Sequence, residues 1–167
     1  MGRLFDAAAA LLEVCTENSF EGESAIHLQQ GAEQSKLQTW QPYCLPIENK
    51  GLVPRDLLEN LQHEKKEGVP VEDLALRFHQ TLVQWIAWVA DTEQIKKVAF
   101  SGGVFQNSLL VDMIIDRMGN YHDLYFHDQL PPNDENIAIG QIAMTKIIVD
   151  NGKQKVAKKQ QNDVICV

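Results

Sequence analysis

The stretch VAFSGGVFQNSLL, residues 98–110, joins a short apolar run to an amphipathic segment through Gly102 and Gly103. The apolar run predicts a buried strand over residues 97–101, and the segment after it predicts a helix over 107–118. A chain that passes from a strand into a helix through two glycines exposes bare backbone at the joint. The stretch therefore raises two questions, which sheet the strand enters and what the glycines are for.

The same order of elements recurs downstream, because an apolar run over 123–127 is followed by a helical pattern over 137–149. Strand, helix, strand and helix in succession predict two parallel strands joined by a right-handed crossover. The fold class that follows is α/β, with a small, partly parallel sheet and flanking helices. The polar, lysine-rich residues 151–167 predict a flexible tail after one domain that spans residues 1–150.

Four helices are expected before the first of these strands. The strongest covers residues 71–91, where apolar side chains recur at spacings of three and four, so that this helix is expected to form the core. The other three cover residues 2–15, about 20–35 and 55–67, and Ser19 is the expected cap of the second. The apolar side chains expected to face inward from the first two are Leu4, Ala8, Leu11, Leu12, Cys15, Ala25, Ile26 and Leu28. Proline-rich residues between these helices predict extended pieces near 38–41 and 43–48.

Composition narrows the classes of protein. Of the 167 residues, 44% are hydrophobic and 23% charged, which predicts a folded core. A net charge of −8 argues against nucleic acid or an anionic membrane as the main partner. No apolar run reaches the roughly 20 residues that span a bilayer, and the N-terminus shows no secretion signal. Three widely spaced cysteines form no metal or disulfide pattern, so a cytoplasmic location is expected.

The glycine pair is compatible with two interpretations. A tight turn is the simpler one. Alternatively, the bare backbone accommodates a nucleotide phosphate or sugar, because no side chain blocks close approach. The stretch lacks the lysine of a P-loop and the third glycine of a dinucleotide-binding motif.

A second loop, LPPNDENIAIGQ, also leads from a strand into a helix, and the two loops are expected side by side at the carboxyl ends of the strands. Asn133 or Asp134 suits the cap of the following helix. Asp134 alternatively suits a metal ligand, although one carboxylate is not a metal site. Among five scattered histidines, His79 flanks the apolar stripe of the long helix, where a hydrogen-bonded core position is expected.

Five stretches together resemble the C-terminal part of HypF-type carbamoyltransferases, which are hydrogenase maturation enzymes. They are, in order, GRLFDAAAALLEV, FEGESA, RFHQTLVQWI, VAFSGGVFQNSLL and LPPNDENIAIGQIA. The resemblance implies one lobe of an actin/sugar-kinase/Hsp70-type fold, similar to the threonylcarbamoyl transferases that modify tRNA. It also implies an ATP-derived carbamoyl-adenylate, whose carbamoyl group passes to the C-terminal cysteine of a partner maturation protein.

The resemblance also implies roles for individual residues. Gly102, Gly103 and Asn107 would line the nucleotide, and Asp6 would meet the ribose. Glu21 and Gly22 would lie nearby. Asp134 would bind a divalent metal, zinc or iron, in the intact enzyme.

Two departures from the family pattern limit what the resemblance implies for this chain. Glu135 and Asn136 stand where the family usually has two glycines, and the lobe with the histidine metal ligands is expected to lie outside this sequence. The chain by itself is therefore expected to be inactive and to hold no metal. The alternative is a non-catalytic binding or assembly module that keeps the fold.

The missing lobe also leads to an expectation about association. A homodimer is expected, held by an unpaired sheet edge and by incompletely covered apolar faces of the first and the 71–91 helices. The competing expectation is a monomer whose residues 38–48 close the sheet edge.

Overall fold

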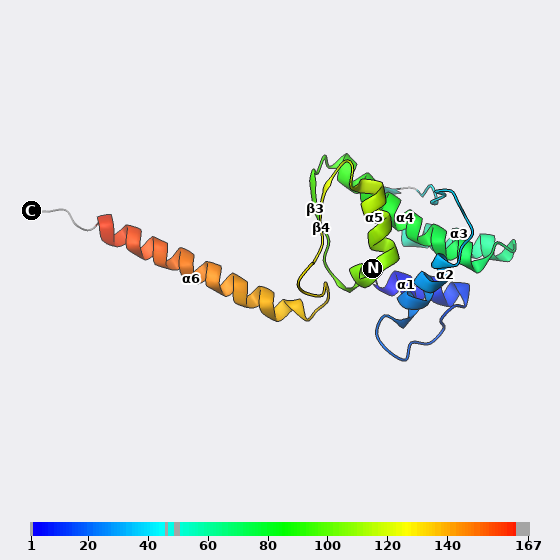
Figure 1. Cartoon of the computed structure of the whole chain (residues 1–167), viewed down its shortest axis with the longest axis horizontal. Coiled ribbons are helices and arrows are strands. Elements are labelled where there is room, and N and C mark those ends of the chain that lie inside the picture. The colour runs from blue at the N-terminus through cyan, green and yellow to red at the C-terminus, as the bar shows by residue number, and fades with distance from the viewer. Residues whose placement is uncertain (1, 46, 49–50, 163–167) are drawn as a thin grey trace, which may run out of the picture.

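The computed structural model describes residues 2–45, 47–48 and 51–162, and it shows a helical body flanked by a small parallel sheet (Figure 1). The elements are α1 (Gly2–Leu12), α2 (Glu23–Glu33), β1 (Ile47–Glu48), β2 (Gly51–Leu52), α3 (Pro54–Lys66), α4 (Val71–Thr92), β3 (Lys97–Ala99), η1 (Gly103–Gln106), α5 (Ser108–Met118), β4 (Asp123–Tyr125) and α6 (Asn136–Asn162). Here η1 is one turn of 3₁₀-helix.

Helix α4 is the centre of the body, as its periodicity predicts. It packs against α1, α2, α3 and α5. Leu74, Phe78 and Leu82 are fully buried, and Phe5 of α1 meets Phe78 edge-on with ring centroids 5.0 Å apart. Helix α1 follows its alanine-rich sequence, because Ala8 and Ala9 are buried and let the neighbouring helices approach closely.

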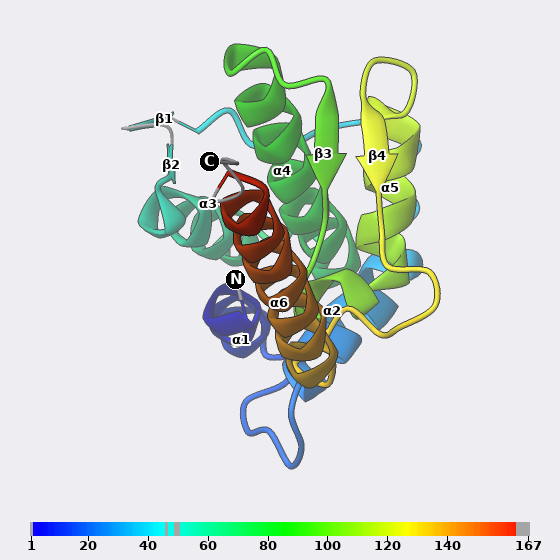
Figure 2. The same ribbon diagram turned by 90° about the vertical axis from the view of Figure 1, so that its left-hand side faces the viewer.

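The parallel pair expected from the sequence is confirmed, but the first strand is not buried as expected, because Lys97 and Ala99 are exposed and Val98 is only half-buried. Strands β3 and β4 run side by side in the same direction (Figure 2), with Val98 opposite Leu124. The pairing continues past both strands, because the Phe100 amide donates to the Tyr125 carbonyl at 2.9 Å. The Phe100 and Phe126 rings then stack with centroids 4.7 Å apart, directly before the two loops of interest. Both strand ends are thus fixed by packing.

Several local expectations were wrong. Residues 38–41 form no strand, and of the piece expected at 43–48 only Ile47–Glu48 is a strand, β1, which pairs antiparallel with β2. This pair is separate from β3 and β4, so residues 38–48 do not close their edge. Position 46 and positions 49–50 lie outside the described residues. Ile26 is 45% exposed, and the buried positions of α2 are Ser24, Leu28 and Ala32. Gly22, at φ 85°, precedes the helix in a left-handed conformation that favours glycine.

Helix α6 extends further than the sequence predicts. It was expected to end at Val149 before a flexible tail, but it continues to Asn162 and projects away from the body (Figure 1). The extension is rich in lysine and glutamine, which favour helix. Positions 163–167 of the expected tail, which include Cys166, lie outside the described residues.

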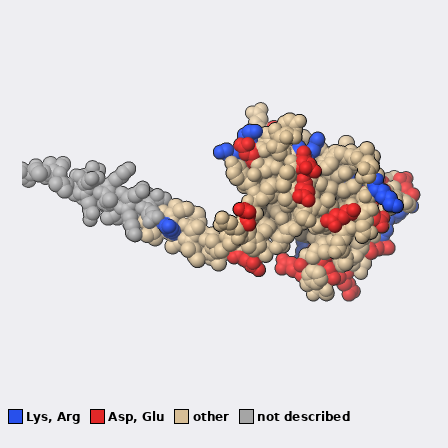
Figure 3. Space-filling view, in the orientation of Figure 1, with Lys and Arg blue, Asp and Glu red and all other residues tan. Residues whose placement is uncertain are grey.

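The surface bears more acidic than basic groups. Acidic side chains are spread over the face of the body seen in Figure 3, whereas the first part of α6 shows mostly uncharged surface. Between Asn136 and Val149 the only charged residue is Lys146. None of the helices in the described part of the chain combines the length and apolar character that a bilayer crossing requires.

Candidate functional site

The two glycines after β3 are required for different structural reasons. Gly102 has φ 105° and ψ 155°, a combination that residues with a side chain rarely adopt. Gly103 has no such backbone, and a methyl group built there would meet nothing closer than Gln106 Oε1 at 4.0 Å. Gly102 is therefore required by the turn itself. Gly103 instead keeps a side chain out of the space in front of η1.

Asn107 begins α5 and links it to the core. Its Oδ1 accepts from the Leu110 amide at 2.9 Å, which makes it the side-chain cap of the helix. Its Nδ2 lies 3.0 Å from His79 Nε2, and Asn107 is only 6% exposed. Both polar ends of the side chain are thus used inside the protein.

His79 is the fully buried partner of Asn107, as expected for a core histidine. Its Nδ1 lies 2.7 Å from the Ala75 carbonyl, so this nitrogen donates and Nε2 accepts from Asn107. Phe5 and Phe78 meet the imidazole edge-on, with centroids 5.6 and 5.5 Å away. Burial in these apolar surroundings lowers the pKa of His79 to about 4. The ring is therefore neutral near pH 7 and connects α4 to the loop after β3.

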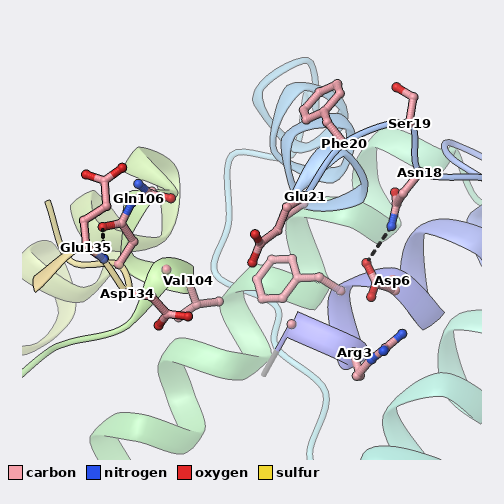
Figure 4. Close-up of a pocket in the computed structure, with 16 residues that line it drawn as sticks. Arg3, Asp6, Asn18, Ser19, Phe20, Glu21, Val104, Gln106, Asp134 and Glu135 are labelled. Carbon is pink, nitrogen blue, oxygen red and sulfur yellow. Dashed lines mark hydrogen bonds between the residues drawn. The ribbon is translucent and has the colours of Figure 1, made fainter. Parts of the chain in front are cut away.

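In front of the glycine turn lies a cleft of about 1010 Å³ (Figure 4). Four separate segments line it, namely the first turn of α1, the loop into α2, the loop after β3 and the loop after β4. Its lining residues are Gly2, Arg3, Phe5, Asp6, Asn18, Ser19, Phe20, Glu21, Gly22, Ala25, Gly103, Val104, Gln106, Asn133, Asp134 and Glu135. Four of these are carboxylates, and Arg3 is the only basic one. An anion that enters this cleft would therefore need a cation beside it.

Asp6 is held in place by a residue that the sequence did not single out. Asn18 Nδ2 donates to Asp6 Oδ1 at 3.2 Å, as the dashed line in Figure 4 shows. The side-chain Oδ1 of Asn18 accepts from the backbone amide of Ser24, at 3.1 Å, and from the Ser24 hydroxyl, at 2.6 Å. Asn18 thus connects α1 to the start of α2. An asparagine in the turn between two helices is the only signal for it in the sequence.

The loop into α2 brings Glu21 and Gly22 to the cleft. Ser19 does not cap the helix as expected, because its amide and hydroxyl donate to the Glu23 carboxylate. The amide hydrogen bond, followed by the hydroxyl, lowers the pKa of Glu23. The loop is tied to the first turn of the helix, and in Figure 4 Glu21 extends between the Asp134 side and the Asp6 side of the cleft.

The loop after β4 brings Asp134 to the opposite side. Asn133 Oδ1 accepts from the Glu135 amide at 3.2 Å, and the Asp134 carbonyl accepts from the Ile137 amide at 3.0 Å. The Asn133 side chain thus stabilises a local turn before α6 and does not bond an amide of the helix itself, and the Asp134 carboxylate is exposed at the cleft. Within the described residues no group of three or more His, Cys, Asp or Glu side chains is placed to hold a metal. Asp134 therefore offers one ligand, and a resident metal does not fit this chain alone.

The structure brings together most of the residues singled out from the sequence. Asp6, Glu21, Gly22, Gly103 and Asp134 all line the cleft. Two do not. Gly102 shapes the turn behind the cleft, and Asn107 is buried against His79. The lining residues that sequence reasoning missed are Arg3, Asn18, Phe20, Val104 and Gln106.

Comparison with known proteins agrees with this fold. A family model described as carbamoyltransferase, Kae1-like domain, second subdomain, matches residues 1–141. The observed fold and the match to this family model identify the chain as a subdomain of a Kae1-like domain. They also confirm the expected fold class, one lobe of the actin/sugar-kinase/Hsp70 type. The chain belongs to the HypF carbamoyltransferase family.

Particular relatives show how much of the family this chain represents. Carbamoyltransferase HypF from Synechocystis is 34% identical over 146 residues, which are 85% of this chain and 19% of the relative. HypF from Rhodobacter capsulatus is 32% identical over 84% of this chain and 18% of the relative. The chain thus spans about a fifth of the length of these relatives.

Two solved structures agree. Full-length HypF in a phosphate- and nucleotide-bound form has a TM-score of 0.77 at 29% identity, over 89% of this chain and 20% of that one. HypF from T. kodakarensis has a TM-score of 0.77 at 27% identity, over 90% of this chain and 20% of that one.

Proposed function

We propose that this chain forms the nucleotide-side wall of a carbamoyl-transfer site. The observation that carries the proposal is the cleft, in which three segments distant in the sequence bring Asp6, Gly103 and Asp134 to one hollow. The solved HypF structure of similar fold holds phosphate and nucleotide, which supports an adenine nucleotide or carbamoyl-adenylate as the ligand here. A cytoplasmic location belongs to the same proposal.

Each wall of the cleft has a distinct part in this proposal. Asp6, oriented by Asn18, accepts hydrogen bonds from the ribose hydroxyls, and Glu21 and Gly22 lie beside it. The backbone at Gly103 lies against the phosphate, because no Cβ stands in the way. Asp134 would supply one ligand to a divalent zinc or iron ion, and the described residues offer no further ones. When bound, such an ion would supply Lewis-acid chemistry and positive charge beside the acidic cleft.

The reaction proposed for the complete enzyme is transfer of the carbamoyl group to a thiol. The C-terminal cysteine sulfur of a partner maturation protein forms a bond to the carbamoyl carbon. The carbon–oxygen bond to the adenylate breaks, AMP leaves, and the thiol proton passes to solvent. The described residues supply binding and orientation for this step, and this chain alone is proposed to be inactive.

A non-catalytic assembly module is the second candidate. It is favoured by Glu135 and Asn136, because their side chains occupy positions where the family usually has glycines. A carboxylate at position 135 adds negative charge to a cleft wall that already holds Asp134. A module of this kind would keep the fold without binding a nucleotide.

Titration with adenosine and ATP distinguishes the two candidates. The proposal predicts saturable binding of both, weaker than micromolar, since one wall of the cleft supplies only part of the contacts. Asp6→Ala is expected to weaken adenosine binding about tenfold through loss of the ribose hydrogen bonds. Asp112→Ala, a matched loss of a carboxylate on α5, is expected to leave it unchanged. No detectable binding of either ligand would support the assembly module, and a sub-micromolar constant for ATP would contradict the one-wall proposal.

A further inference from the structure

Ser101, His127 and Asn136 form a chain of polar contacts across the ends of the two parallel strands. Ser101 follows β3 and His127 follows β4, and Ser101 Oγ lies 2.9 Å from His127 Nε2. The other imidazole nitrogen, Nδ1, lies 3.4 Å from Asn136 Nδ2 at the start of α6. The three residues come from separate positions in the sequence, and the parallel pairing of the strands brings them together.

The direction of these hydrogen bonds follows from Asn136. Its Nδ2 also donates to the Pro131 carbonyl, which can only accept. The amide therefore has its NH₂ group on the side of Pro131 and His127, with Oδ1 buried on the other side. Because an NH₂ group donates and does not accept, the facing His127 Nδ1 must be the nitrogen without hydrogen. The neutral imidazole then carries its hydrogen on Nε2.

This tautomer determines what Ser101 is able to offer. His127 Nε2–H donates to Ser101 Oγ, so the hydroxyl oxygen is the acceptor in that bond. The hydroxyl hydrogen is then left to donate elsewhere. Ser101 is exposed and stands next to Gly102, at the turn whose next residue, Gly103, lines the cleft. An exposed hydroxyl donor beside a turn without side chains suits an anionic oxygen.

We infer that Ser101 is a phosphate-binding residue at the glycine turn, and that His127 and Asn136 are positioning residues that fix its hydroxyl as a donor. The inference rests on the proposed nucleotide site. It also gives Asn136 a task, since a glycine at this position would leave the imidazole tautomer unfixed. The presence of a side chain where the family usually has glycine then supports ligand binding rather than obstructing it.

The tautomer is tested without any ligand. Long-range ¹H–¹⁵N spectra at about pH 8, above the usual titration range of histidine, report which ring nitrogen carries hydrogen. The His127 signal is identified by its loss in His127→Gln. We expect the Nε2–H form in the unaltered chain and a mixture of both forms in Asn136→Ala. Asn133→Ala removes a neighbouring amide that bonds the Glu135 amide rather than the ring, and it should leave the tautomer unchanged.

The binding role is tested with ATP as the probe. Loss of a hydrogen bond to a charged group in Ser101→Ala is expected to weaken ATP binding roughly tenfold or more. Ser101→Thr keeps the hydroxyl and should bind like the unaltered chain. Adenosine, which has no phosphate, should bind equally to all three. Ser108→Ala is the matched loss of a serine hydroxyl away from the cleft, where Ser108 Oγ accepts from Gln29.

Each result decides something different. The Nδ1–H form of His127 in the unaltered chain would overturn the proposed direction of the hydrogen bonds. The expected tautomer combined with full ATP affinity in Ser101→Ala would overturn the phosphate-binding role. If neither adenosine nor ATP binds the unaltered chain, the nucleotide site itself is refuted, and the role of Ser101 with it.

Discussion

His79 Nε2 lies 3.0 Å from Asn107 Nδ2, and both side chains are buried between the long helix α4 and the loop that carries the two glycines. This contact ties the wall of the cleft to the centre of the core. The residue that caps α5 is thus the same residue that pairs with the buried histidine. Because Asn107 supplies the cap with one end and the pair with the other, the position of the loop after β3 depends on the neutral form of His79.

The protonation of His79 predicts how stability changes with pH. Its folded-state pKa is lowered to about 4 by burial, so the unfolded chain takes up a proton before the folded one does. The stabilisation that comes from keeping the buried His79 ring neutral is fully present above about pH 6.5 and is lost as the pH falls toward about 4. Over this range the free energy of unfolding should change by about 3 kcal/mol. Urea unfolding across this range measures it. His79→Leu should be less stable at neutral pH and should lose this part of the pH dependence; an equally steep profile in the variant would contradict the assignment.

Asn107 is expected to contribute through both ends of its side chain. Asn107→Ala removes the cap of α5 and leaves a buried imidazole nitrogen unpaired, so a loss of about 2 kcal/mol in unfolding free energy is expected. Asn107→Ser keeps an oxygen that caps the helix and loses only the donor to His79. The serine variant should therefore lie between the alanine variant and the unaltered chain in urea unfolding. Equal losses in both variants would show that the cap contributes nothing.

Replacing each of the two glycines by alanine should affect a different property, stability at Gly102 and ligand binding at Gly103. Gly102→Ala forces a side chain onto a backbone with φ 105°, and we expect a loss of about 1–3 kcal/mol in stability although no atom stands within 4 Å of the new methyl group. Gly103→Ala should leave the unfolding temperature nearly unchanged and weaken ATP binding more than adenosine binding, because its methyl group stands where the phosphate is proposed to lie. Thermal unfolding and ligand titration of the pair separate the two roles. A Gly102→Ala chain as stable as the unaltered chain would refute the conclusion that the backbone at this position requires glycine.

Metal content is a further prediction about this chain alone. Asp134 is exposed, and the described residues place no second or third ligand beside it, whereas catalytic zinc usually has three protein ligands. We expect elemental analysis of the purified, desalted chain to find no stoichiometric zinc or iron, and Asp134→Ala to give the same result. One metal per chain that is lost in the alanine variant would show that ligands were overlooked.

Elements with strong periodicity or special backbone were predictable from the sequence. The apolar spacing of α4 placed the core, and two apolar runs separated by a helical pattern placed β3 and β4 in parallel. Gly102, Gly103 and Asp134 were singled out because each lies where a predicted strand passes into a predicted helix, whereas Asp6, Glu21 and Gly22 came only from the resemblance to a family. Asn18 and the His127–Asn136 contact were not found. Such contacts depend on turns that bring side chains together from different elements, and no short period in the sequence records them.

The exposed side of α6 predicts self-association, but through a different surface from the one expected from the sequence. The apolar faces of α1 and α4 were expected to be incompletely covered, and this was wrong, since Phe5, Leu12, Phe78 and Leu82 are at most 2% exposed. Apolar exposure lies instead on α6, at Ile137, Ile139, Ile142, Met144, Ile147, Ile148 and Val149. Each strand of the β3–β4 pair also keeps one edge without a partner strand among the described residues.

We therefore expect a homodimer that buries the apolar part of α6. Large exposed apolar patches drive association, and this part of the helix has only Lys146 to oppose it. Light scattering should give about twice the 18.9 kDa mass of one chain. Ile142→Glu places a charge at the most exposed of these apolar positions and should restore the single-chain mass with unchanged helix content. Gln141→Glu adds the same charge at a neighbouring polar position and should remain dimeric. A single-chain mass that persists in the unaltered protein up to about millimolar concentration would refute the dimer, because a contact weaker than that contributes less than about 4 kcal/mol.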